Sequence, residues 1–144
     1  MEKAKAKGVQ VVLPVDCVIA QEVKTGVPTQ TVAVHNIPKG WRGLDIGPET
    51  VKAFAEVIKR SKTVVWNGPM GVFEIPEFEK GTFAVADCIA NASVMSVVGG
   101  GDSVAALKKS GNQSKVTFVS TAGGAFMELL EGKVLPGIKA LDRD

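Results

Sequence analysis

Glycine-rich clusters occur at three points of the sequence, each directly after a short apolar run. Asn67, Gly68 and Pro69 follow VVW, the triple glycine at 99–101 follows VMSVV, and Ala122, Gly123 and Gly124 follow VTFVST. A residue without a Cβ atom lets a large anion approach the backbone, and the amides of a following helix can then bond phosphate oxygens. Turn geometry explains any one cluster, whereas three in succession favour a site for a phosphate chain.

Asp102 follows the triple glycine at a predicted helix start, where it would face a bound phosphate. A Mg²⁺ ion between the two anions would remove their repulsion, because it binds one or two carboxylates together with phosphate oxygens and water. The alternative is that Asp102 caps the helix by accepting backbone amide bonds, with no metal. The next residue, Ser103, could donate its hydroxyl to a phosphate, although a serine in a first helical turn is more often solvated.

Glu74 lies beside Phe73 at the end of NGPMGVFE, where its carboxylate could accept bonds from ribose hydroxyls. The ordinary alternative is a solvated loop glutamate. Neither standard phosphate motif occurs, since G-x-x-x-x-G-K-[ST] is missing and the triple glycine does not complete G-x-G-x-x-G. The residue pattern alone therefore predicts an anion-binding α/β domain.

The elements that would position these residues are short β-branched runs separated by helical segments. Strands are predicted at residues 9–13, 31–35, 63–66, 94–98 and 116–119. Several runs are apolar without alternation, which predicts a parallel sheet covered by helices on both faces. Ligands bind at the carboxyl ends of the strands in such a sheet, and the glycine clusters lie there.

Helices are predicted where apolar residues recur at helical spacing. They involve Val51, Phe54, Ala55 and Ile58 after Pro48; Phe78, Val85 and Ile89; residues 103–109; and Phe126, Leu129 and Leu130, ending near Gly132. The segment 17–29 has the weak pattern typical of a hairpin or loop, and residues 135–144 leave the periodic pattern.

Composition sets limits on the class of protein. The 144 residues, 45% of them hydrophobic, suit one domain, and a net charge of +2 matches neither a disordered chain nor a basic nucleic-acid binder. Cys17 and Cys88 lack metal or redox spacing and are predicted to be buried thiols. With no run of roughly 18 apolar residues, we expect a soluble protein of a reducing compartment.

Four segments, GWRGLDIGP, VVWNGPMGVFE, VVGGGDSVAA and STAGGA, resemble the carboxyl-terminal, nucleotide-binding half of phosphoglycerate kinases. The likeness extends over almost the whole chain. It implies an α/β fold, a three-layer sandwich with a parallel, doubly wound (Rossmann-like) sheet, present here as an incomplete nucleotide-binding lobe. Residues 1–144 would form a single domain, with 133–144 as a tail that crosses to an absent amino-terminal lobe.

The resemblance implies a transferase of glycolysis that moves a phosphoryl group reversibly from 1,3-bisphosphoglycerate to MgADP, giving ATP and 3-phosphoglycerate. Adenine and ribose would contact Gly43, Gly68, Pro69, Phe73 and Glu74, with Glu74 taking the ribose hydroxyls. Asn67 would lie near the terminal phosphates, and Gly100, Gly101, Asp102 and Ser103 would hold the phosphate chain, with Mg²⁺ at Asp102. Gly123 and Gly124 would be the catalytic residues that face the phosphoryl group in transit.

The same resemblance implies limits. The family usually has three glycines after Ser-Thr, whereas this chain has Ala122 first, and its Cβ requires a compatible backbone angle. Phosphoglycerate would bind only with the missing lobe, so we expect the fragment alone to be inactive. The alternatives are a non-catalytic nucleotide-binding module and a truncated product that folds poorly or pairs through its sheet edges. We expect no nucleic-acid or membrane partner, a monomeric parent enzyme, and a cytoplasmic or plastid location.

Overall fold

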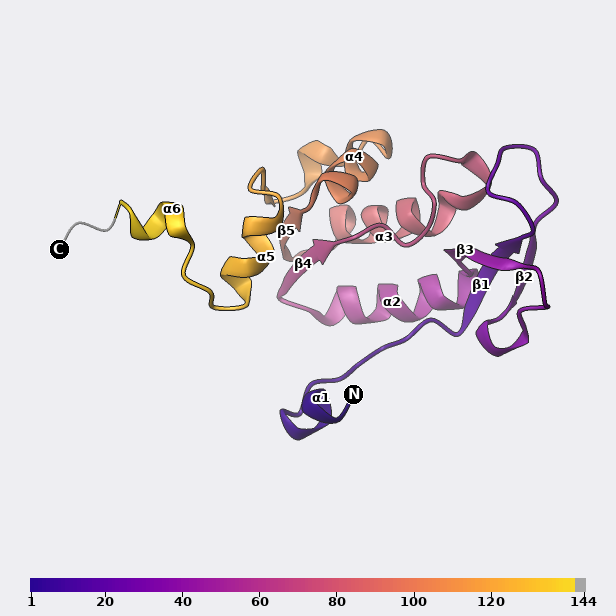
Figure 1. The fold of residues 1–144 in the computed structure, drawn as a ribbon, viewed down its shortest axis with the longest axis horizontal. Helices are drawn as coiled ribbons and strands as arrows, with labels where there is room; N and C mark the ends of the chain where they lie inside the picture. Colours follow the sequence, from indigo (N-terminus) through magenta and orange to yellow (C-terminus); the bar gives the residue numbers. More distant parts are fainter. Residues whose placement is uncertain (142–144) are drawn as a thin grey trace.

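A computed structural model describes residues 1–141, and Figure 1 shows two small sheets connected and flanked by helices. The strands are β1 (Asp16–Ala20), β2 (Gln30–Ala33), β3 (Arg42–Ile46), β4 (Thr63–Asn67), β5 (Met95–Gly99) and β6 (Phe118–Val119). The helices are α1 (Glu2–Ala6), α2 (Pro48–Arg60), α3 (Lys80–Asn91), α4 (Gly101–Lys109), α5 (Gly124–Leu130) and α6 (Pro136–Lys139). Short 3-10 helices cover Val34–Asn36, Pro76–Phe78 and Gln113–Lys115.

Strands β4, β5 and β6 form a parallel sheet in that order, as predicted for the second half of the chain. Trp66 and Val98 lie buried on one face, in a core to which α2, α3 and α4 all contribute. On the other face, Val65, Met95 and Phe118 are 45%, 58% and 58% exposed. The α/β class with a parallel sheet is thus confirmed, and within residues 1–141 helices cover one of its faces.

The first half of the chain folds differently from the sequence expectation. Strands β1, β2 and β3 form an antiparallel sheet in the order β2-β1-β3. The segment 17–29 was expected to be a hairpin or loop, and β1 and β2 do pair as a hairpin. Instead of the strand predicted at 31–35, the structure has β2, which ends at Ala33 and pairs antiparallel with β1. The strand predicted at 9–13 is wrong, because this segment lies outside any strand and Val9 and Leu13 are 56% and 58% exposed.

Helix α2 begins at Pro48, as predicted, and the antiparallel sheet supplies its cap. The Asp16 carboxylate accepts hydrogen bonds from the amides of Glu49 (3.0 Å) and Thr50 (2.8 Å) and from the Thr50 hydroxyl (2.6 Å). The Thr50 hydroxyl oxygen in turn accepts the amide of Val15 at 3.0 Å. Burial raises the pKa of Asp16, but these hydrogen bonds outweigh it and hold the pKa below its usual value. One buried carboxylate therefore connects the sheet to the helix.

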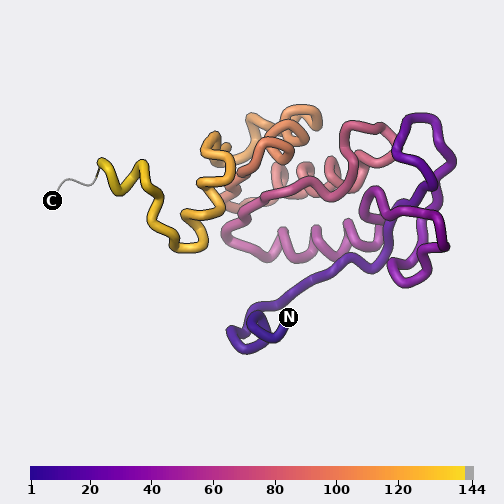
Figure 2. The backbone as a smooth tube through the Cα atoms, in the orientation of Figure 1, coloured from indigo at the N-terminus to yellow at the C-terminus, as the bar shows by residue number. Residues whose placement is uncertain are grey.

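Helices α3, α4 and α5 lie where the apolar spacing placed them, whereas α6 was not predicted and falls in the segment 135–144 that leaves the periodic pattern. Helix α3 carries Val85 and Ile89 in the core, while Phe78 belongs to the 3-10 helix before it. Helices α4 and α5 follow the second and third glycine clusters, and α5 ends shortly before Gly132. Figure 2 shows the chain before β1 and the segment with α6 extending away from the central body. The tail expected to cross to another lobe includes 142–144, which lie outside the described residues, so that role stays a prediction.

Candidate functional site

The first glycine cluster turns sharply away from the end of β4. Gly68 has φ of +96°, a conformation that glycine adopts without a Cβ penalty. Its amide donates to the Ser103 hydroxyl at 2.6 Å, and its carbonyl accepts the indole N–H of Trp66 at 2.8 Å. Trp66 is buried, so the corner is fixed from the core side while Asn67 stays exposed.

The second cluster lies against the first. Asn67 and Gly99 are register partners of β4 and β5, and the Asn67 side-chain amide donates to the Gly99 carbonyl at 3.0 Å. Gly100 has φ of +89°, and a Cβ there would lie 2.9 Å from Asn67 Nδ2. A side chain at this position would therefore be strained and would displace the asparagine.

The start of α4 offers unobstructed backbone and a carboxylate. Gly100 is the N-cap, so the alternative of Asp102 as the N-cap is wrong. Asp102 lies exposed in the first turn, and a Cβ added at Gly101 would meet nothing within 4 Å. The alternative of a solvated Ser103 is also wrong, because this residue is 1% exposed and its hydroxyl oxygen accepts the Gly68 amide.

The third cluster lies beside the second because the chain continues along β5 after β6, with the Ser120 amide donating to the Val98 carbonyl at 2.8 Å. Gly123 is the N-cap of α5 with φ of +55°, and Cβ atoms at Gly123 and Gly124 would meet open space. Among residues 1–141 every positive φ belongs to a glycine, so Ala122 has an ordinary backbone angle and its methyl group is accommodated.

A cavity of about 420 Å³ opens beside the first corner. It is lined by Gly43 and Leu44 of β3, by Pro69, Met70 and Val72 of the segment after β4, and by residues around the start of β1 and just after the end of β2. Because Pro69 follows Gly68 directly, the cavity adjoins the first glycine corner. Its mostly apolar wall suits a flat ring system.

Of the five residues predicted to contact adenine and ribose, Gly43 and Pro69 line this cavity. The other three, Gly68, Phe73 and Glu74, do not. Phe73 is 6% exposed and belongs to the hydrophobic core, so its ring supports the loop from the protein interior. Glu74 is exposed, two residues after Val72, which lines the cavity. The Val72 amide donates to the Leu44 carbonyl at 2.9 Å and holds this loop against β3.

Asp45 is a buried carboxylate in the cavity wall that sequence analysis did not single out. It is 4% exposed, and burial raises its pKa to about 6 despite hydrogen bonds from the amides of Gly81 (2.7 Å) and Ile46 (2.9 Å). Gly71 and Gly81 pack directly against it. The sequence feature that could have identified Asp45 is that it is the one acidic residue inside the short apolar segment GLDIG.

Residues 1–141 contain no group of three or more His, Cys, Asp and Glu side chains arranged to hold a metal. None of the described helices is long and apolar enough to span a membrane. Cys17 is a buried free thiol, and Cys88 is a free thiol that is half-buried.

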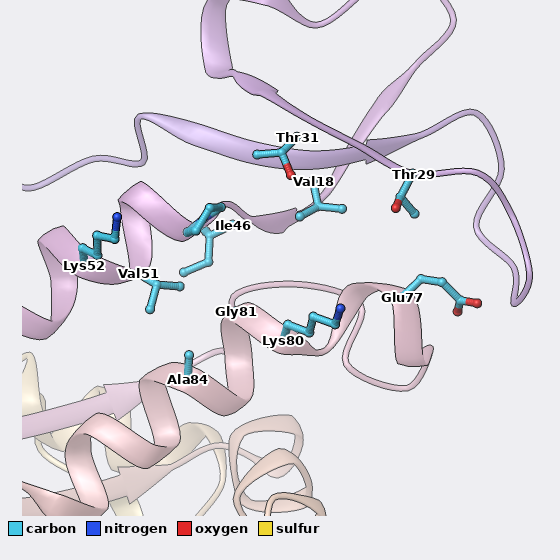
Figure 3. A pocket seen from close by; sticks show the side chains of 11 residues that line it. Val18, Thr29, Thr31, Ile46, Val51, Lys52, Glu77, Lys80, Gly81 and Ala84 are labelled. Atoms are coloured by element: carbon cyan, nitrogen blue, oxygen red, sulfur yellow. The ribbon is translucent and has the colours of Figure 1, made fainter.

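A larger cavity, of about 540 Å³, lies between the antiparallel sheet and the first turns of α2 and α3 (Figure 3). Val18, Ile46 and Val51 form apolar wall, and Lys52 and Lys80 flank the opening. None of the three glycine corners lines it. Size alone therefore does not make it the functional site, and the three glycine corners remain the predicted one.

Comparison with known proteins gives a consistent result. The model of the family described as phosphoglycerate kinase matches residues 1–133. Phosphoglycerate kinases of Pelobacter propionicus and of a Synechococcus strain are 53% and 56% identical to 99% and 98% of this chain. The chloroplastic phosphoglycerate kinase of Volvox carteri is 54% identical to 96% of it. The chain spans 36%, 35% and 31% of these three relatives' lengths.

A solved structure, that of phosphoglycerate kinase from Coxiella burnetii, superposes on 97% of this chain with a TM-score of 0.92 and 44% identity. The superposed part is 36% of that chain. The phosphoglycerate kinase of Pyrococcus horikoshii superposes with a TM-score of 0.77 and 30% identity.

Proposed function

The chain belongs to the phosphoglycerate kinase family, and on that premise we propose that it is the nucleotide-binding part of such an enzyme. It would hold MgADP or MgATP while a phosphoryl group passes between 1,3-bisphosphoglycerate and ADP. In the reverse direction the carboxyl group of 3-phosphoglycerate accepts the phosphoryl group from ATP. The parent enzyme would therefore be a phosphotransferase with a carboxyl group as acceptor. Because the chain matches about a third of its relatives, phosphoglycerate contacts are expected from residues outside it.

One observation carries the proposal, namely the direct contact between two glycine corners from distant parts of the chain. Gly68 bonds Ser103 at 2.6 Å, and Asn67 bonds Gly99 at 3.0 Å. The strand order adds the third corner next to β5. Backbone without side chains at three adjacent strand ends suits a phosphate chain.

Asp102 is the residue that we assign to Mg²⁺. A bare carboxylate in the first turn of α4 would repel a polyphosphate bound at the same helix start. Asp102 would hold Mg²⁺ together with the phosphate, and the ion would supply the positive charge that removes this repulsion. Gly100 and Gly101 would bring their backbone next to that phosphate.

We assign the base to the cavity beside Gly43 and Pro69, and the ribose to its rim. Apolar contacts from Leu44 and Val72 suit the faces of a purine. Glu74, exposed after Val72, would accept hydrogen bonds from the ribose hydroxyls. Phe73 would support this loop from the core.

The residues of this chain would contribute positioning and charge stabilisation to the transfer. The bond between the acyl oxygen and phosphorus of 1,3-bisphosphoglycerate breaks, a bond from a terminal ADP oxygen to that phosphorus forms, and 3-phosphoglycerate leaves as a carboxylate. Amides at Gly123 and Gly124 would stabilise charge on the equatorial oxygens. Catalysis of this kind depends on aligning both substrates, so we expect negligible turnover from the chain alone.

We further propose a monomeric parent enzyme in the cytoplasm or, given the chloroplastic relative in Volvox, in a plastid.

Calorimetric titration with ADP, with and without Mg²⁺, tests the proposal. We expect metal-dependent binding by the wild-type chain and loss of that dependence in Asp102→Asn, with MgADP affinity lower by roughly tenfold to a hundredfold. Glu49→Gln is the matched control, because Glu49 is also an exposed carboxylate in a first helical turn, that of α2. Equal affinity for ADP with and without Mg²⁺ in the wild type would contradict the role of Asp102.

A coupled assay of ATP formation tests the expected absence of turnover by the chain alone, and measurable ATP formation would contradict that expectation.

A further inference from the structure

Lys109, the last residue of α4, reaches across to the loop that carries Glu74. Its ammonium group donates to the Phe73 carbonyl at 2.8 Å and to the Glu74 carbonyl at 3.4 Å. It also pairs with the Glu79 carboxylate at 2.8 Å and lies 5.7 Å from the centre of the Phe83 ring. One side chain thus contacts two adjacent carbonyls of the loop and the residue that precedes α3.

This ion pair differs from the others among residues 1–141. The pairs at Lys24, Lys52, Lys59 and Lys133 each join residues two or three positions apart. Lys109 and Glu79 are separated by 30 positions. Glu79 is also the more buried partner, 23% exposed. An exposed local pair contributes little, whereas a charge shared among two carbonyls, a carboxylate and a ring restricts the loop.

Helix α4 therefore connects the two halves of the proposed site. Asp102 and Ser103 lie at its first turn, and Lys109 at its last. Loop residues 70–75 have no helix or strand of their own. Amides within the loop donate to the carbonyls of Gly71 and Val72, whereas Lys109 donates to the adjacent carbonyls of Phe73 and Glu74. The geometry points to Lys109 as a positioning residue: it fixes the loop so that Glu74 meets the ribose hydroxyls while the start of α4 holds the phosphates. This inference rests on the proposed function.

The test compares two probes in Lys109→Met, with Lys108→Met as the control from the same helix turn. MgADP carries a ribose, and magnesium tripolyphosphate does not. We expect Lys109→Met to weaken MgADP binding about tenfold and to change tripolyphosphate binding less than about twofold, because the phosphate corners are untouched. Lys108→Met should leave both affinities unchanged, and Lys109→Arg should recover part of the MgADP affinity.

A double-mutant cycle with Glu74→Gln separates positioning from general loosening. If Lys109 acts through Glu74, adding Lys109→Met to Glu74→Gln costs no further MgADP affinity. If Lys109→Met unfolds the chain, Glu79→Gln replaces it in the test, because that change removes only the carboxylate partner of Lys109. Glu79→Gln must then weaken MgADP binding more than tripolyphosphate binding, by a smaller factor than expected for Lys109→Met. An equal loss for both probes, or none for MgADP, would overturn the inference. Failure of the wild-type chain to bind either probe would instead contradict the proposed function on which the inference depends.

Discussion

At the scale of single residues, two aspartates beside the proposed site lie in opposite environments. Asp102 is exposed at the first turn of α4, where a cation can reach it. Asp45 is buried in the cavity wall with two backbone amides as its partners. The exposed residue therefore suits ligand binding, and the buried one contributes a pH dependence to folding.

Asp45 gives a prediction with a definite sign. Its pKa is about 6 in the folded chain against 3.8 when unperturbed, so the folded state binds this proton more tightly. The free energy of unfolding should consequently fall as pH rises from about 4 to about 6, and the contribution should be constant outside that window. Urea unfolding at a series of pH values measures this slope, which Asp45→Asn should remove. An identical slope in wild type and Asp45→Asn would show that another group is responsible.

The identities of the corner residues could be predicted from the sequence, because glycine after an apolar run signals a strand-to-helix turn. The internal partners of the site residues could not. Ser103 meets Gly68 across 35 positions, and Phe73 faces the core although its neighbour Glu74 faces solvent. Such contacts depend on the tertiary fold, which no local pattern records.

At the scale of elements, helices α2 to α5 were predictable, whereas α6 and the first sheet were not. Helical periodicity is local, so α2, α4 and α5 were recognised from their own residues. Strand β3 contains Gly43 and Asp45, which are unfavourable in isolated strands, and it forms because β1 provides a partner. The apolar segment 9–13 has strand composition but no partner strand within residues 1–141.

Removal of the Asp16 carboxylate tests how strongly the antiparallel sheet stabilises α2. Asp16→Ala leaves the amides of Glu49 and Thr50 without their acceptor and should lower the free energy of unfolding by about 2 kcal/mol at neutral pH. Because the pKa of Asp16 is lowered on folding, its contribution should disappear as pH falls through and below about 4.

Urea unfolding of Asp16→Ala beside Glu49→Ala checks this prediction. Glu49 lies exposed at the same helix start, and its truncation should change stability by less than about 0.5 kcal/mol. Equal losses from the two variants would show that the buried cap has no special role.

At the scale of the whole molecule, one face of the parallel sheet remains uncovered in the described chain. The apolar runs in β4, β5 and β6 predicted that both faces of the sheet are covered. The runs themselves do not reveal whether helices of the same chain or other protein surface provides that cover. Val65, Met95 and Phe118 are the exposed side chains. Within residues 1–141, β4 and β6 each pair on one side only, with β5.

We predict that the chain self-associates increasingly as its concentration rises, because the apolar face and the open strand edges favour contact between copies. Phe118→Thr should reduce the association with little change in stability, since the ring is mostly exposed. Val134→Thr is the control, as Val134 is 74% exposed outside the sheet. Sedimentation velocity over a concentration series measures the effect, and a strictly monomeric wild type would contradict it.

Mapping the backbone amides during titration with MgADP tests the central claim most directly, because it locates the phosphate chain as well as detecting it. We predict that the largest chemical-shift changes in ¹⁵N spectra occur together at Gly68, Gly101 and Gly124, with smaller ones at Gly43 beside the cavity. Changes confined to other parts of the chain, such as the cavity between α2 and α3, would contradict a nucleotide site built from three glycine corners.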